Sequence, residues 1–241
     1  MNLDQLRVTY QIRKLEVEKI WQRNKELKSD EEMFALLVSC IISSRAKWKS
    51  VKAAMNRLKN NRVLFVGNHD NIKQQLKGIS GRYINIDRLA DYILQARESF
   101  PFLSWIIRGI LNNQISLTPQ GLNFRDVCRL QDLGQLCELL QERRLSTEGL
   151  REMVKQIKGI NDKQASHFLA TLGFEDYAIL DTHVLKQLVE NGVITEKPKY
   201  LSHRKYTAIE ELMKEFSKSI GIPFPHLDTI FWEEGSRGKN C

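Results

Sequence analysis

The chain lacks several features that would assign it to a special class of protein. It has four cysteines and five prolines in 241 residues, and no run of about twenty apolar residues that could span a membrane. The cysteines are far apart, which excludes an iron–sulfur cluster held by clustered cysteines. No signal or transit peptide is visible, so we expect a cytoplasmic protein in a reducing compartment.

Basic residues are plentiful by contrast. The chain has 37 Lys and Arg against 29 Asp and Glu, for a net charge of +8. These residues are spread along the chain instead of forming a tail. The pattern favours a folded surface that binds a polyanion over a disordered basic arm, although many basic proteins bind no nucleic acid.

Helical periodicity dominates and helix breakers are few, so we predict a mainly α fold. Residues 3–27 form a predicted amphipathic helix. Ser29 to Glu32 is a capping box, and the apolar helix that follows it, residues 33–44, should lie at the centre of a core. The predicted core positions of the first helix are Leu6, Ile12, Leu15 and Ile20.

The stretch from Thr147 to Leu185 carries the most specific pattern. Two helix-patterned segments flank a tight turn that begins at Lys158 and contains Gly159 and Asn161. We expect both of these to adopt positive φ, because glycine and asparagine do so at least cost. The turn amides then point outward and can bind a nucleic-acid phosphate. The alternative is an αα-corner that only packs.

Lys163 and Asp181 are the candidate catalytic residues. Lys163 lies at the start of the second helix, where the helix dipole and partial desolvation disfavour the charged ammonium, so that a free amine can form a Schiff base. Asp181 precedes a new helical run and reads as an N-cap. A capped carboxylate keeps its orientation, so it could also stabilise a cationic transition state. The alternatives are an ordinary surface lysine and a purely structural cap.

The runs from Lys158 to Leu169 and from Ala178 to Leu185 resemble the helix-hairpin-helix DNA glycosylases. The chain is most similar to their type-2 8-oxoguanine DNA glycosylase/AP lyase branch. In that branch the hairpin lysine is the nucleophile and an aspartate eighteen residues later assists, and Lys163 and Asp181 have this separation. The resemblance implies excision of 8-oxoguanine by attack of Lys163 at C1′, with associated AP lyase activity.

The sequence departs from the family pattern at three places. Asn161 replaces a second hairpin glycine, Arg45 replaces a glutamine, and the chain ends in Asn240-Cys241 where the branch tends to end in a lysine. The departures leave two alternatives open. One is a glycosylase for a bulky modified pyrimidine, such as modified cytosine in phage DNA, acting in defence. The other is a non-catalytic helix-hairpin-helix module that only binds DNA.

Further residues are candidates for contacts with DNA or the base. Ser44, Arg45 and Lys47 follow the apolar helix, whose end points at DNA in the family; a solvated helix end is the alternative. The resemblance also implies that Trp232 stacks on the target base and that His167 belongs to the hairpin site. Trp232 could equally be a core residue.

A predicted helix from Ile86 stops before Pro101, and the next one reaches about Asn113. Trp105, Asn113 and Gln114 in this region have the chemistry to line a base pocket, because an aromatic ring stacks on a base and amides read its edge. Core packing is the alternative for Trp105.

By analogy with the family we expect two helical subdomains. A helical barrel of residues 29–173 contains the hairpin, and residues 1–28 join 174–241 in the second. An active-site cleft would lie between them, with Lys163 on one wall and Asp181 on the other. The expected partner is double-stranded DNA, bound by a monomer. We expect no metal or other cofactor apart from a monovalent cation at the hairpin.

Overall fold

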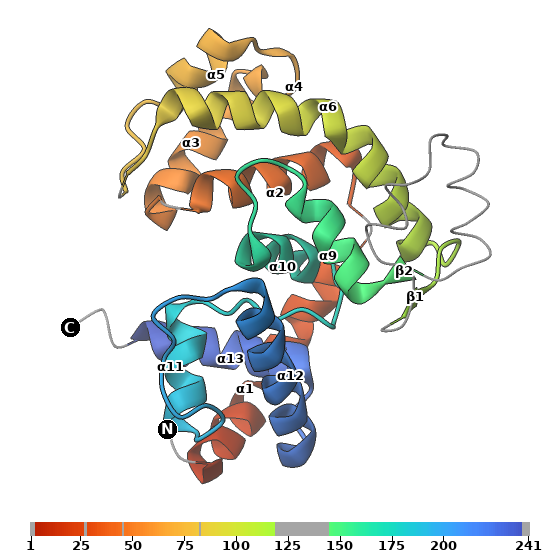
Figure 1. Cartoon of the computed structure of the whole chain (residues 1–241), viewed down its shortest axis with the longest axis vertical. Helices are drawn as coiled ribbons and strands as arrows, with labels where there is room; N and C mark the ends of the chain where they lie inside the picture. Colours follow the sequence, from red (N-terminus) through yellow and green to blue (C-terminus); the bar gives the residue numbers. More distant parts are fainter. Residues whose placement is uncertain (1–2, 27, 45, 82, 119–144, 238–241) are drawn as a thin grey trace. The chain divides into compact units, whose positions relative to one another are not determined.

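The computed structural model describes residues 3–26, 28–44, 46–81, 83–118 and 145–237. It is mainly helical, which confirms the predicted fold class (Figure 1). The described strands are two short segments, β1 (Leu117–Thr118) and β2 (Leu145–Ser146), paired in parallel. No helix in the described ranges is both long enough and apolar enough to cross a membrane.

The chain divides into two compact units. The hairpin unit is Leu27–Phe168, and the terminal unit combines Met1–Glu26 with Leu169–Cys241. The expected boundaries were residues 28/29 and 173/174, so residues 27–28 and 169–173 fall in the other unit.

The hairpin unit is built around α2 (Asp30–Ser43), which packs against α3 (Trp48–Asn60) and α6 (Ile86–Leu111) (Figure 1). The predicted capping box is confirmed: the Glu32 N–H donates to the Ser29 hydroxyl and the Ser29 N–H to the Glu32 carboxylate. The remaining helices of this unit are α4 (Val63–Val66), α5 (His69–Leu76), α9 (Thr147–Lys155) and most of α10 (Asp162–Thr171).

Helix α6 continues through Pro101, so the predicted break before this residue was wrong. Proline in a helix interior removes a hydrogen bond and costs about 3 kcal/mol. Phe100 and Leu103 on either side of it are buried, and each such side chain contributes about 1.5–3 kcal/mol on burial. Packing against the core therefore outweighs the local preference, and the helix bends instead of ending (Figure 1).

The terminal unit consists of α1 (Leu3–Lys25), α11 (Thr182–Glu190), α12 (His203–Ile220) and α13 (Phe224–Arg237). Of the predicted core positions of α1, only Leu6 is buried; Ile12 and Leu15 are 78% and 73% exposed. The predicted set was wrong because its members do not share one helical face. The buried positions, which are spaced four and seven residues apart, are Leu6, Tyr10, Val17 and Trp21.

Candidate active site

The turn between α9 and α10 contains the expected phosphate-binding residues. Gly159 has a φ of +91°, which confirms the predicted positive φ at this position. A Cβ atom here would lie 2.7 Å from a ring carbon of Tyr92 and 3.2 Å from a methyl carbon of Ile41. Both the backbone conformation and the available space therefore require glycine.

Asn161 does not adopt the predicted positive φ, so that prediction was wrong. It caps α10 instead. Its side-chain Oδ1 accepts the N–H groups of Lys163 and Gln164 at 3.0 Å and 3.3 Å. Asparagine is one of the strongest N-cap residues, because its side chain satisfies amides that the first turn leaves open. The residue thus fixes the start of the helix that carries Lys163.

The turn still presents open backbone donors. Among the residues that the structure describes, no acceptor binds the N–H groups of Gly159 and Asn161. Both residues line a cavity of about 210 Å³ in the hairpin unit, together with Ser44 and Arg88. The described lining contains a guanidinium group and no carboxylate. The cavity therefore suits an anion such as a backbone phosphate.

Lys163 lies half-buried in the first turn of α10. The three residues that follow it, Gln164 to Ser166, are buried in the core. The positive charge of Lys163 acts to lower the pKa of the Cys40 thiol in α2. Burial raises the pKa of Cys40 to about 12, against the opposing effects of a hydrogen bond with Ser39 and of the Lys163 charge. The thiol stays protonated, as expected for a buried cysteine. The buried thiol therefore does not act as a nucleophile in this part of the hairpin unit.

Lys155 forms two salt bridges, one within α9 and one that connects α9 to α10. Lys155 Nζ lies 2.6 Å from Glu152 Oε1 and 2.7 Å from Asp162 Oδ1. Burial acts against the Lys155 ammonium, but the bonds to Asp162 and Glu152 outweigh it and raise the pKa of Lys155. Because Asp162 is the first residue of α10, this contact holds the start of α10 against α9.

Asp181 caps α11 as predicted. Its Oδ1 accepts the N–H groups of His183 and Val184 at 2.7 Å and 2.9 Å. Within the described parts of the chain, no donor bonds to its second oxygen, Oδ2. The cap therefore fixes the orientation of the carboxylate through one of its two oxygens.

The segment that leads to Asp181 is held by buried polar side chains from α12 and α13. The Ala178 N–H donates to Glu210 at 2.7 Å, and the Ile179 N–H to Asp228 at 3.1 Å. The hydroxyl of Tyr206 accepts the Leu180 N–H at 3.2 Å and donates to the Ala178 carbonyl at 2.6 Å. We call Tyr206, Glu210 and Asp228 the clamp. These residues were not predicted, because each is distant in sequence from the segment it holds.

The clamp contains a carboxyl group with an altered pKa. Burial raises the pKa of Asp228 to about 7; the hydrogen bond from Ile179 opposes this shift, and the charges of Asp181 and Glu210 add to it. The carboxyl group of Asp228 is therefore partly protonated near neutral pH, and its protonated fraction falls as the pH of the solution rises through 7.

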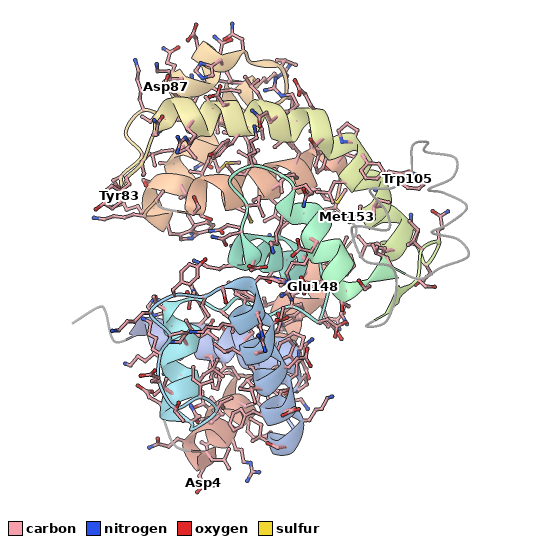
Figure 2. All side chains as sticks on the ribbon, in the orientation of Figure 1. Asp4, Tyr83, Asp87, Trp105, Glu148 and Met153 are labelled. Atoms are coloured by element: carbon pink, nitrogen blue, oxygen red, sulfur yellow. The ribbon has the colours of Figure 1, made fainter. Side chains whose placement is uncertain are left out.

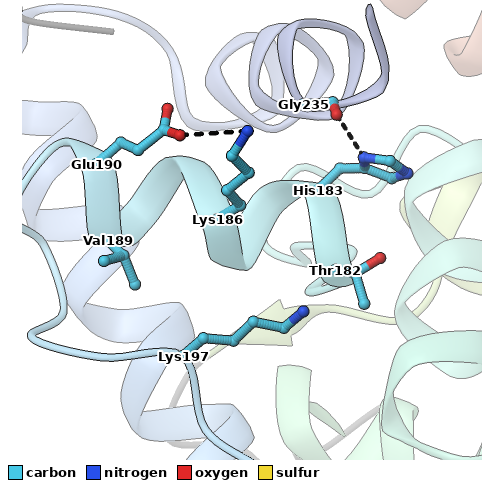
Figure 3. A pocket seen from close by; sticks show the side chains of 7 residues that line it. All are labelled: Thr182, His183, Lys186, Val189, Glu190, Lys197 and Gly235. Carbon is cyan, nitrogen blue, oxygen red and sulfur yellow. Dashed lines mark hydrogen bonds and ion pairs between the residues drawn. The ribbon is translucent and has the colours of Figure 1, made fainter. Parts of the chain in front are cut away.

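A larger cavity, of about 650 Å³, lies beside the start of α11. Thr182, His183 and Lys186 of α11 line it, and Lys197 faces them from the loop that follows (Figure 3). His183 Nδ1 lies 2.6 Å from the Gly235 carbonyl oxygen. Since a carbonyl only accepts, Nδ1 donates in this hydrogen bond. Two of the lining residues are lysines, Lys186 and Lys197, and a third, Thr182, directly follows Asp181 in the chain.

The other predicted contact residues are distributed over both units. Ser44, Lys47 and Lys158 are exposed in the hairpin unit, whereas Arg45 lies outside the described residues. Trp105 is 41% exposed on α6 (Figure 2), so it is not a core residue. Its ring stacks on that of Phe102.

Asn113 and Gln114 are exposed in the turn after α6, where Asn113 has a φ of +58°. Trp232 is 47% exposed on α13 in the terminal unit. Lys163 and Asp181 belong to different units, and the expected cleft stays a prediction.

One aromatic residue next to the hairpin was missed. The ring of Trp48 lies 6.5 Å from that of His167, measured between centroids. His167 follows Lys163 by one turn of α10. Trp48 was not predicted, because it is distant in sequence from the hairpin residue that it contacts.

Two helices joined by a glycine turn with open amides, the second helix capped by Asn161, are the features of the helix-hairpin-helix class of DNA-binding folds. Comparison with known proteins identifies the family within this class. A family model described as 8-oxoguanine DNA glycosylase matches residues 13–222. The chain therefore belongs to the 8-oxoguanine DNA glycosylase family.

Individual relatives agree with this assignment. The chain is 30% identical over 205 residues to the 8-oxoguanine DNA glycosylase/AP lyase of Korarchaeum cryptofilum, which covers 85% of this chain and 80% of that protein. The crystal structure of the 8-oxoguanine DNA glycosylase of Thermotoga maritima has the same fold, with a TM-score of 0.71 at 24% identity over 98% of this chain and 96% of that chain. The Methanocaldococcus jannaschii 8-oxoguanine glycosylase/lyase, in complex with a 15mer DNA containing 8-oxoguanine, gives a TM-score of 0.64 at 25% identity and covers 95% and 92% of the two chains.

Proposed function

We propose that this protein is a DNA glycosylase and AP lyase that removes 8-oxoguanine from double-stranded DNA. The observation that carries the proposal is the position of Lys163. This lysine follows a turn with open amides and starts a helix capped by Asn161, in a chain of the 8-oxoguanine DNA glycosylase family. The K. cryptofilum relative is named as a glycosylase/AP lyase, and the M. jannaschii relative was crystallised with DNA containing 8-oxoguanine.

Binding begins at the hairpin. The amides of Gly159 and Asn161, with the nearby charges of Lys158 and Arg88, hold a backbone phosphate. A monovalent cation at the hairpin would add positive charge to this grip. With the backbone fixed, one nucleotide leaves the base stack, which costs a few kcal/mol and less for a damaged base.

The chemical steps are assigned to Lys163 and Asp181. The Lys163 amine attacks C1′, the C1′–N9 bond breaks, and the base leaves with the bonding electrons. The carboxylate of Asp181 stabilises the positive charge that develops on the sugar and accepts a proton from the amine. The sugar ring then opens to a Schiff base. Loss of a C2′ proton expels the 3′ phosphate, which nicks the strand on the 3′ side.

A base-release assay tests the substrate. We expect the wild-type protein to release 8-oxoguanine from a duplex and to leave an otherwise identical undamaged duplex intact. Lys163→Arg serves as the matched control, since it keeps the charge and removes the nucleophile. Tight binding without base release from any damaged duplex would indicate a non-catalytic module. Release of modified cytosine from phage DNA, with none from the 8-oxoguanine duplex, would overturn the assigned substrate.

A further inference from the structure

Trp48, the first residue of α3, is an exposed aromatic side chain on a fixed backbone. It is 49% exposed. The Lys47 N–H donates to the Ser80 carbonyl at 2.8 Å, and the Ser80 N–H donates to the Ser50 hydroxyl at 3.2 Å. These bonds tie the start of α3 to the loop before α6. A flat apolar ring held in this way loses little freedom on binding a ligand.

The indole lies against the part of α10 that carries Lys163. Its ring and that of His167 are 6.5 Å apart and inclined by 52°. Lys163 and His167 are four residues apart, so their side chains emerge on one face of the helix. The residues between them, from Gln164 to Ser166, are buried. Trp48 contacts His167, which is thus the one side chain between the indole and Lys163 along this face of α10.

The second contact of the indole, a cation–π contact with Lys52, can be replaced by a stacked base. Lys52 Nζ lies 5.7 Å from the ring centroid, one helical turn further along α3. A cation over an exposed ring is held more weakly than a nucleobase stacked on tryptophan. An ammonium released from the ring can neutralise a DNA phosphate instead. A base arriving at Trp48 can therefore replace Lys52.

We propose that Trp48 is a base-stacking residue: the base extruded next to Lys163 packs on the indole, and Lys52 moves from the ring to a backbone phosphate. This inference rests on the proposed function, because it requires a base extruded at Lys163. It adds a contact in the hairpin unit that recognises the aromatic surface of the base.

Binding measurements in the Lys163→Gln protein test the stacking, because this variant does not turn over. Two duplexes of one sequence are compared: one carries 8-oxoguanine, and the other carries a tetrahydrofuran abasic analogue, which has no base to stack. We expect Trp48→Ala to weaken binding of the 8-oxoguanine duplex about tenfold and to leave binding of the analogue within roughly twofold. Trp48→Phe should restore most of the loss.

The matched control is Tyr200→Ala, which removes another exposed aromatic ring, 74% exposed, from the terminal unit. It should leave both affinities unchanged. Equal weakening of both duplexes by Trp48→Ala would overturn the inference, since it would indicate a contact with the rest of the DNA. Unchanged binding of both would overturn it as well.

The salt dependence of binding tests the movement of Lys52. We expect Lys52→Met to reduce the slope of log affinity against log salt by about 0.9, the value for one phosphate contact. Lys59→Met removes an equal charge from the same helix and is the control. An identical slope in the two variants would contradict the transfer of Lys52 to a phosphate.

Borohydride trapping separates this inference from the proposed function. A natural abasic site has no base, so Trp48→Ala with an intact Lys163 should be trapped on it as fully as the wild type. If both proteins are trapped but the binding assay shows no preference for the duplex with a base, the stacking inference alone fails. If the wild type itself is not trapped, the proposed function fails.

Discussion

Lys163 and Asp181 are held in place by different means. The lysine depends on neighbours in sequence: Gly159 makes the turn, Asn161 caps the helix, and Lys155 connects the two helices. The segment before Asp181 depends on side chains that follow it by 26 to 49 residues. A change near Lys163 should therefore act locally, whereas Asp181 is sensitive to changes in distant helices.

The largest expected effect is that of Asp181→Asn. Asparagine can still cap α11 through its oxygen, but it carries no charge to stabilise the transition state. We expect the rate of base excision to fall about 10²- to 10³-fold with DNA affinity nearly unchanged. Single-turnover kinetics and equilibrium binding measure the two quantities. Asp176→Asn, in the same loop, is the control and should be neutral; a parallel loss of rate and affinity in Asp181→Asn would indicate only a structural cap.

The clamp is tested by Tyr206→Phe. The substitution leaves the buried Leu180 N–H and Ala178 carbonyl without the hydroxyl that bonds to both. Two unsatisfied buried groups should lower the free energy of unfolding by about 3 kcal/mol, measured by urea denaturation. Tyr200→Phe removes an exposed hydroxyl and should change nothing. Equal stability of the two variants would show that the segment does not need the clamp.

Alanine substitutions at Gly159 and Gly192 distinguish the effect of backbone strain on stability from the effect of close packing. Gly159 and Gly192 both have positive φ, +91° and +70°, but no atom lies within 4 Å of a Cβ added at Gly192. Gly192→Ala should lower stability by about 1 kcal/mol. Gly159→Ala should lower it by about 2 kcal/mol, because Tyr92 must also move, and should weaken DNA binding. The hairpin model is wrong if DNA affinity is the same in both variants.

The smallest expected effect is on pH dependence. The pKa of Asp228 is about 7 in the folded protein, above its ordinary value of 3.8, so the folded state binds the proton more tightly. The resulting stability is complete below the unfolded pKa and is lost as the pH rises through 7. From pH 8 to pH 6 the free energy of unfolding should rise by about 1 kcal/mol from this group. Asp228→Asn does not titrate and should lack this rise; an identical pH profile would contradict the assignment.

The parts of the fold that the sequence predicts correctly depend on short-range chemistry. The capping box at Ser29, the glycine turn and the cap at Asp181 each involve residues within four positions, so a local pattern is sufficient. Asn161 was predicted incorrectly because asparagine is common both at positive φ and at N-caps. Its conformation in the folded chain, which caps α10, distinguishes the two.

The features that the sequence does not reveal depend on long-range packing. Helix α6 continues through Pro101 because its flanking side chains are buried. The clamp residues are polar and widely separated, and their common target is visible only in three dimensions. Trp48 is a candidate for base stacking because it contacts His167 on another helix, and no rule of sequence spacing predicts this contact.

Borohydride trapping on a duplex containing 8-oxoguanine is the most direct test of the claim that Lys163 is the nucleophile. The wild-type protein should form a covalent complex of protein and DNA, while Lys163→Gln and Lys163→Arg should form none, although Lys163→Arg keeps the positive charge. Trapped complexes of wild-type yield in both variants would show that another group attacks the sugar and would contradict the account.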